Sequence, residues 1–147
     1  MEMEFTNTAM LGPIFAQIAL TLIVFVILMA RRLPAMAAAK PTPEQMQDKG
    51  NLGRLPAPAR FAAENYNHQF EMPVLFYVLC LTALVSGLGG ALCVTLAWIY
   101  VVLRMVHSVI HCTYNNVMHR FLVFAISAFV LMAILGMMAL EFWGIYV

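Results

Sequence analysis

The chain has 147 residues, of which 63% are hydrophobic and only 10% are charged, and its formal net charge is +1 at pH 7. A length of this size suits one domain, but the composition excludes an ordinary soluble domain. The net charge by itself is uninformative, and we expect no nucleic-acid partner.

Four segments carry no charged residue at all, namely 10–30, 72–85, 91–103 and 121–140. The first and last reach about the 20 residues with which a helix spans a bilayer, and charged ends extend the middle two. Since no segment alternates as a membrane barrel strand does, helices remain as the spanning elements. We therefore expect an all-α membrane protein, a bundle of four transmembrane helices forming a single domain over residues 1–147.

The first expected helix covers residues 10–32, with Pro13 in its first turn and the pair Arg31-Arg32 at its end. Its acidic leader, its long core and the double arginine argue against a cleaved signal peptide. The arginines could simply anchor the helix to phosphate headgroups. The segment 33–58 has five prolines, so we expect a cytoplasmic loop there.

The second expected helix covers residues 59–87 and ends before a Gly-Gly turn. Polar residues recur along its cytoplasmic half at intervals of three and four, which places them on one face. This stripe consists of Arg60, Glu64, Asn67, His68 and Glu71.

The third expected helix covers residues 91–115 and carries a second polar stripe. Its members are Arg104, His107, His111 and either Tyr114 or Asn115, which again fall on one face. Because helices 2 and 3 form an antiparallel hairpin, Arg104 and Glu71 reach nearly the same depth. We expect these two opposite charges to pair.

The fourth expected helix covers residues 118–143, with Arg120 near its start and the aromatic residues Trp143 and Tyr146 near its end. The basic residues of the chain gather in the first loop and its flanks and at both ends of the third loop. The positive-inside rule therefore predicts a multi-pass membrane protein with both termini outside and the loops between helices 1–2 and 3–4 in the cytoplasm.

The two stripes combine cations, carboxylates, amides and a tyrosine, groups that suit a small, polyanionic ligand with peptide groups. His107 and His111 could bind a metal together with Glu71 or His119, but neither an HExxH pattern nor a closed ligand set is present, so we expect no metal. The three cysteines show neither a disulfide framework nor zinc spacing.

Two motifs resemble the MAPEG family, the membrane-associated proteins of eicosanoid and glutathione metabolism. The segment 65–76, NYNHQFEMPVLF, is similar to the helix-2 signature of that family. The pattern Arg104-x-x-His107-x-x-x-His111, followed by Arg120, is similar to its signature in helices 3 and 4. The segment NHQFEMPVLFY is also similar to that of bacterial members, which implies a bacterial inner membrane.

The resemblance implies a homotrimer that binds glutathione as co-substrate between adjacent protomers, near the cytoplasmic side. Asn67 and Glu71 would hold the tripeptide backbone, with the carboxylate of Glu71 facing the α-amino group. The other binding residues would be Arg31, Arg32 and Arg104 for carboxylates, His107 and His111 for the tripeptide, and Tyr114, which could equally bind a lipid headgroup.

Arg120 would face the thiol, and the resemblance implies that it acts as electrostatic activator. A thiol with a pKa of about 8.5 is mostly protonated at neutral pH, and a nearby guanidinium lowers this pKa. Arginine stays protonated, so Arg120 would stabilise the thiolate without accepting its proton. The thiolate would attack a lipophilic electrophile that enters from the bilayer, as a transferase or a peroxidase does.

The sequence departs from the family pattern in three places. His111 stands where many members have tyrosine, Asn67 and Glu71 are four apart instead of three, and Phe121 replaces a serine found beside the arginine. These differences leave conjugation or peroxide reduction as the generic activity. A second functional class stands beside it: a non-catalytic membrane protein that binds a small anion or lipid, or a small transporter that uses Glu71 as its intramembrane carboxylate.

Overall fold

The computed structural model describes residues 2–47 and 49–145, and within them every regular element is a helix. The helices are α1 (Glu2–Ala39), α2 (Pro43–Gln47), α3 (Lys49–Leu52), α4 (Ala57–His68), α5 (Met72–Ser86), α6 (Gly90–Cys112) and α7 (Val117–Phe142). Four stretches are long and apolar enough to cross a membrane, and they are Thr8–Ala39, Ala57–Ser86, Gly90–Cys112 and Val117–Phe142. The expected four-helix, all-α membrane architecture is confirmed.

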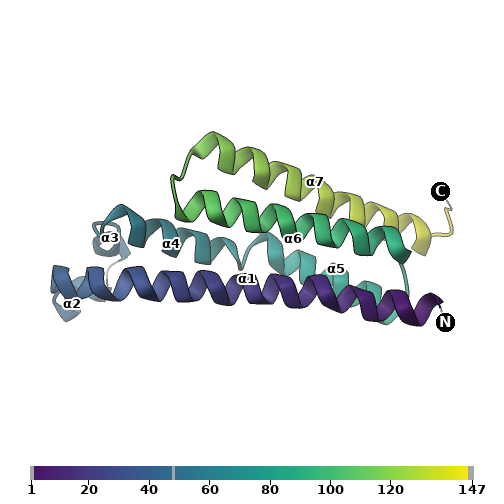
Figure 1. Ribbon diagram of the computed structural model, residues 1–147, viewed down its shortest axis with the longest axis horizontal. Helices are drawn as coiled ribbons and strands as arrows, with labels where there is room; N and C mark the ends of the chain where they lie inside the picture. Colours follow the sequence, from purple (N-terminus) through teal and green to yellow (C-terminus); the bar gives the residue numbers. More distant parts are fainter. Residues whose placement is uncertain (1, 48, 146–147) are drawn as a thin grey trace.

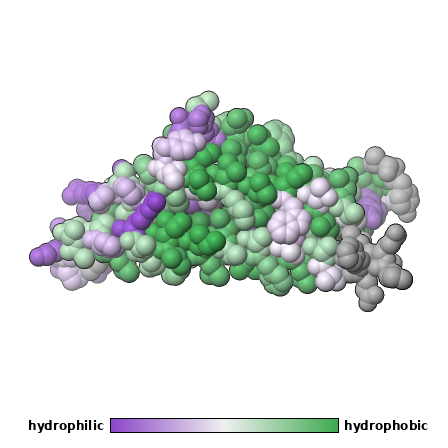
Figure 2. Space-filling model, in the orientation of Figure 1, coloured by the Kyte–Doolittle hydropathy of each residue, from purple (hydrophilic) through white to green (hydrophobic). Residues whose placement is uncertain are grey.

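The four spans run alternately in opposite directions, so both termini lie at one end of the bundle and α2 and α3 at the other (Figure 1). Helix α1 packs against α4, α5 and α6, whereas α7 packs on α6 and α5. Hydrophobic residues cover the middle of the visible face, and hydrophilic residues gather around α2, α3 and the α6–α7 turn (Figure 2). This distribution fits a molecule with its middle in lipid and one polar end in water.

The apolar core lies in the half of the bundle nearest the termini. Phe76 of α5 stacks on Tyr100 of α6, with ring centroids 4.6 Å apart and planes 12° from parallel. Ile14 of α1 and Ile134 of α7 close the same cluster from the two outer helices. This packing leaves the polar side chains to the opposite half.

Helix α1 is longer than the expected 10–32. It continues past the two arginines through Pro34 to Ala39, and the expected loop 33–58 therefore contains one end of α1 and the short helices α2 and α3. Alanine has the highest helix propensity, and the alanines that follow Pro34 favour this extension. Lys40, with a positive φ of 44°, ends the helix. Tyr146, which the sequence places near the end of the fourth helix, lies outside the described residues.

The second expected helix, 59–87, is two helices, because α4 ends at His68 and α5 begins at Met72. Pro73 explains the break: proline lacks the N–H that would bond to Gln69, and its ring clashes with that carbonyl. Between the helices, Glu71 has φ −100° and ψ −106°, outside the helical region. The break exposes the last carbonyls of α4 in the middle of a membrane span.

Candidate functional site

Three side chains of the third-helix stripe point into the bundle from α6. Arg104 and His111 are fully buried, and His107 is 2% exposed. Their spacing places them on successive turns of one face, as the sequence predicts. The start of α6 lies at the end with the termini, and Arg104 lies roughly 21 Å along the helix from there, inside a hydrocarbon core of about 30 Å.

Arg104 binds the broken end of α4. Its Nη2 donates to the carbonyl oxygen of His68 at 3.0 Å. In the part of the chain that the structure describes, no ion pair joins Arg104 to Glu71, so the expected pair is not formed. The expected single helix over 59–87 would leave His68 without a free carbonyl. Because α4 ends at His68, this carbonyl oxygen is free to accept from Arg104.

Glu71 instead pairs with His68, whose Nδ1 lies 2.7 Å from its Oε2. The Glu71 side chain is 55% exposed on the outer surface of the single chain. Asn67 is exposed as well. These two expected ligand-binding residues therefore lie on the rim of the polar cluster, outside its buried part.

His68, His107 and His111 form a triangle of rings, with centroids between 5.4 and 5.8 Å apart. Both ring nitrogens of His107 and Nδ1 of His111 have no hydrogen-bond partner among the described residues. Their donor atoms do not converge: over residues 2–47 and 49–145, no group of three possible ligands is placed to hold a metal ion. The rings therefore keep hydrogen-bonding capacity that the described residues do not use.

The α6–α7 turn brings Arg120 to this cluster through two consecutive asparagines. Asn115 adopts a positive φ of 45°, a conformation that asparagine tolerates better than most residues. Asn116 caps α7, since its Oδ1 accepts from the N–H groups of Met118 at 3.0 Å and His119 at 3.2 Å. Arg120 then lies one turn into α7, where its Nη1 is 2.8 Å from His111 Nε2 and 2.9 Å from Asn115 Oδ1.

The remaining expected binding residues lie apart from the buried cluster. Arg31 donates to the Cys112 carbonyl at 2.6 Å, so it binds the last turn of α6, where a positive charge is favourable. Arg32 is half-buried beside it on α1. Tyr114 is exposed, and its hydroxyl lies 3.2 Å from Nδ1 of His119.

A buried polar network that the sequence reading misses connects α1, α4 and α6. Gln17 donates to Gln69 at 3.1 Å, and Gln69 donates to Ser108 at 3.2 Å. Ser108 donates to Asn65 at 3.3 Å, and Asn65 donates to the sulfur of Cys112 at 3.2 Å. The sequence contains the signal that identifies this network. The buried residues of α5 include Phe76 and Pro73, and the same spacing of three and four residues continues toward the N-terminus to Gln69 and Asn65, which are not members of the predicted stripe.

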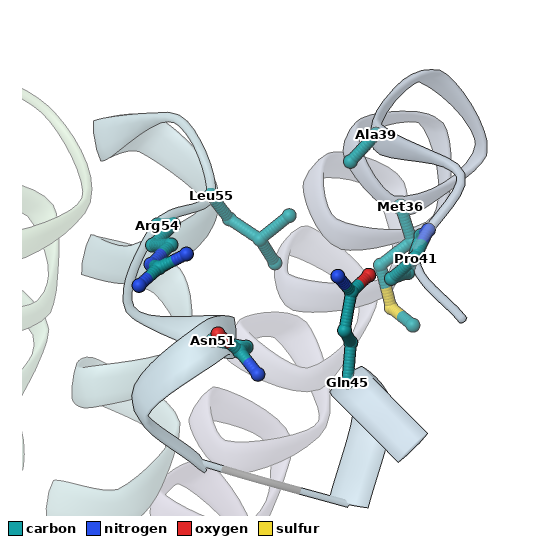
Figure 3. Close-up of a pocket in the computed structure, with 7 residues that line it drawn as sticks. All are labelled: Met36, Ala39, Pro41, Gln45, Asn51, Arg54 and Leu55. Atoms are coloured by element: carbon teal, nitrogen blue, oxygen red, sulfur yellow. The ribbon is translucent and has the colours of Figure 1, made fainter. Parts of the chain in front are cut away.

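Two hollows lie outside the cluster. A cleft of about 150 Å³ lies between the end of α1, α2 and the segment after α3, with Gln45, Arg54 and Leu55 around it (Figure 3). An apolar groove of about 440 Å³ runs along α1 and α5, past Ile18, Phe70 and Tyr77. Neither hollow contains Arg104, His107 or His111. The polar cluster remains the candidate site, because these three buried side chains have polar atoms without a partner among the described residues.

The chemistry available at this cluster is that of an anion site. Nε and Nη1 of Arg104 have no acceptor among the described residues, although the side chain is fully buried. A buried charge without a full set of partners is costly, and so are buried donors without acceptors. A negatively charged ligand with several hydrogen-bond acceptors would offset the charge of Arg104 and accept from its two unpaired donor groups.

Comparison with models of known protein families gives a match over most of the chain. The family model described as MAPEG family matches residues 10–140. No curated protein matches the chain, and no solved structure matches it.

Proposed function

Because the chain belongs to the MAPEG family, we propose that it is a glutathione-dependent membrane enzyme, a transferase or peroxidase that acts on lipophilic electrophiles. The family includes glutathione transferases and related membrane proteins. The observation that carries the proposal is the buried guanidinium of Arg104, with two donor groups that no described residue satisfies.

Glutathione has the groups that this site lacks. Its two carboxylates can accept from the free Nε and Nη1 of Arg104, and the unused nitrogens of His107 can bond to its peptide groups. Its ammonium group can pair with Glu71, which lies beside His68 at the rim. Polar groups at membrane depth are expensive unless they serve a function, which favours a ligand here over a purely structural cluster.

Arg120 is the group that would act on the thiol. Its charge would lower the pKa of the bound thiol and raise the thiolate fraction at neutral pH. As a transferase, the thiolate forms a carbon–sulfur bond to the electrophile and its leaving group departs. As a peroxidase, the thiolate attacks a peroxide oxygen and the O–O bond breaks, which gives a sulfenic acid and, with a proton from water, an alcohol. The thiol of a second glutathione then attacks the sulfenic acid to form the disulfide and release water.

The exposed rim supports a site shared between copies of the chain. Glu71 lies roughly 22 Å from the end of α5, which is still inside the hydrocarbon core. A carboxylate more than half exposed at that depth would face lipid in a single chain. A homotrimer in which a second copy covers Glu71 and Asn67 removes that cost and completes the glutathione site.

The proposed location is a bacterial inner membrane, with both termini outside and the polar cluster toward the cytoplasm. Supporting this orientation, α2, α3 and the α6–α7 turn lie at the same end of the bundle (Figure 1). The basic residues concentrate at that end, as they do on cytoplasmic sides.

The test is calorimetric titration of glutathione into the full chain in nanodiscs, with the ultraviolet absorbance of the thiolate recorded in parallel. We expect the native protein to bind glutathione saturably and to show the thiolate absorbance at neutral pH. We expect Arg120→Ala to lose this absorbance and to keep its fold. A small panel of electrophiles and peroxides then distinguishes transferase from peroxidase. Absence of glutathione binding would favour the anion-binding or transport alternative.

A further inference from the structure

Two oppositely charged side chains approach the same nitrogen of His111. Arg120 Nη1 lies 2.8 Å from His111 Nε2, and Glu64 Oε2 lies 3.4 Å from it. Arginine is a donor only, so this nitrogen must accept when it bonds to Arg120. That bond requires a neutral imidazole with its proton on Nδ1.

Protonation of His111 reverses this arrangement. With a proton on Nε2, the ring can donate to the carboxylate of Glu64 but can no longer accept from Arg120. Two adjacent cations also repel each other, whereas Glu64 stabilises the charged ring. The position of the Arg120 guanidinium therefore depends on the proton of His111.

We propose that His111 is a positioning residue, which holds Arg120 in its thiol-activating place while the imidazole is neutral and releases it when the ring is protonated. The proposal rests on the function proposed above and adds a regulatory step to that site. It assigns to His111 a contact with a side chain of its own chain in place of a contact with the tripeptide.

A second acceptor makes this positioning effective. Arg120 Nη1 also donates to Asn115 Oδ1 at 2.9 Å, so two fixed groups share one guanidinium nitrogen. Ordering the long side chain of arginine costs rotamer entropy. Losing either acceptor would return the half-buried side chain to several conformations.

The charged groups around His111 come from every element packed on it. On α4 these are Glu64 and His68, on α6 His107, and on α7 Arg120. From α1, Arg31 binds the carbonyl of the adjacent Cys112. Apart from Glu64, the nearby full charges are positive, and they oppose a further charge on the ring.

The test uses two substitutions of His111 that distinguish the effect of its hydrogen-bond acceptor from the effect of its ring. His111→Gln keeps a side-chain oxygen able to accept from Arg120, whereas His111→Phe keeps a ring of similar size without an acceptor. Glutathione affinity is measured by calorimetry, and the thiolate absorbance of bound glutathione is recorded as a function of pH.

The expected result is a loss of about tenfold in the thiolate-to-thiol ratio for His111→Phe at neutral pH, the size of one charge-assisted hydrogen bond. His111→Gln should stay close to the native ratio and lose the decline in thiolate that accompanies imidazole protonation. Glu64→Gln removes the charge that stabilises the protonated ring, so its thiolate should persist to lower pH than in the native protein.

The outcomes separate the two proposals. Native protein that does not bind glutathione overturns the proposed function. Binding with an unchanged thiolate ratio in His111→Phe overturns the positioning role alone. Equal losses in His111→Phe and His111→Gln do the same, because they assign the histidine to the ligand. If His111→Phe does not fold, the pH profiles of His111→Gln and Glu64→Gln still decide.

Discussion

The guanidinium of Arg104 is held by the carbonyl oxygen of His68, 3.0 Å away, at the point where α4 stops inside the membrane span. A helix end carries a partial negative charge, so it can hold a cation without neutralising it fully. Arg104 thus keeps both its position and most of its charge for a ligand. A carboxylate partner would have neutralised that charge.

Arg104→Met should separate binding from stability. A buried charge without a carboxylate partner keeps a desolvation cost that no ion pair offsets, and an apolar side chain of similar length removes this cost. We therefore expect the thermal midpoint in detergent to stay the same or rise, while glutathione affinity falls about tenfold or more. Arg54→Met, at an exposed position outside the cluster, is the control and should change neither quantity. A large fall in the midpoint would show that Arg104 is mainly structural.

The sequence predicts the four spans because their composition and length leave no other solution in lipid. It also places Arg104, His107 and His111 correctly on one inner face. It fails where a single residue changes the chain path: Pro73 breaks the second helix, and at this break Glu71 forms no ion pair with Arg104 among the described residues. Periodicity assumes an unbroken helix, so no count of spacings could give the partner of Arg104.

Glu71→Gln should weaken glutathione binding by about tenfold, because it removes the negative charge proposed to face the ammonium group. Glu64→Gln is the matched comparison, since both carboxylates are about half exposed and each lies near a histidine. We expect Glu64→Gln to change affinity by less than about threefold, within the range of an exposed ion pair. Equal losses measured by calorimetry would mean that the wrong carboxylate has been chosen.

Asn116→Ala should lower the free energy of unfolding by about 1 kcal/mol, the usual contribution of a helix N-cap. The side-chain oxygen accepts from the N–H groups of Met118 and His119, which have no partner within the helix. Asn116→Asp keeps an acceptor at the same place and should keep the stability. Reversible unfolding in mixed micelles measures both, and an equal loss in the two variants would contradict the cap.

Glu141→Ala should destabilise the opposite end of the bundle by about 1 to 3 kcal/mol. Its Oε2 accepts from the backbone N–H of Gly89 at 2.7 Å, so α7 caps the start of α6. The negative charge also lies where a helix N-terminus favours it. Glu141→Gln keeps the acceptor and loses the charge, so its loss in the same unfolding measurement should be smaller. Unchanged stability in Glu141→Ala would contradict a stabilising role of the contact between Glu141 and Gly89.

The buried network shows a second limit of the sequence reading. Polar residues 60, 64, 67, 68 and 71 form a convincing helical stripe, but Asn65 and Gln69, between its members, are the buried ones. The chain has polar residues on two adjacent faces of α4, and only packing against α1 and α6 decides which face is inside. The apolar face of α5 indicates the answer, because its spacing of three and four residues continues back to Gln69 and Asn65.

The last prediction concerns the outer face that carries Asn67 and Glu71. If a second copy covers it, a cysteine at position 67 should react with a membrane-permeant maleimide about tenfold or more slowly than one at position 85, as protected sites do. Val85 is 90% exposed and lies near the other end of the same span, which makes Val85→Cys the control for Asn67→Cys. The native cysteines Cys80, Cys93 and Cys112 are buried and should give little background.

Native mass spectrometry should find three chains of 16.4 kDa in one particle. Equal labelling of the two cysteines together with a single-chain mass would leave Glu71 facing lipid, and the shared site would have to be abandoned.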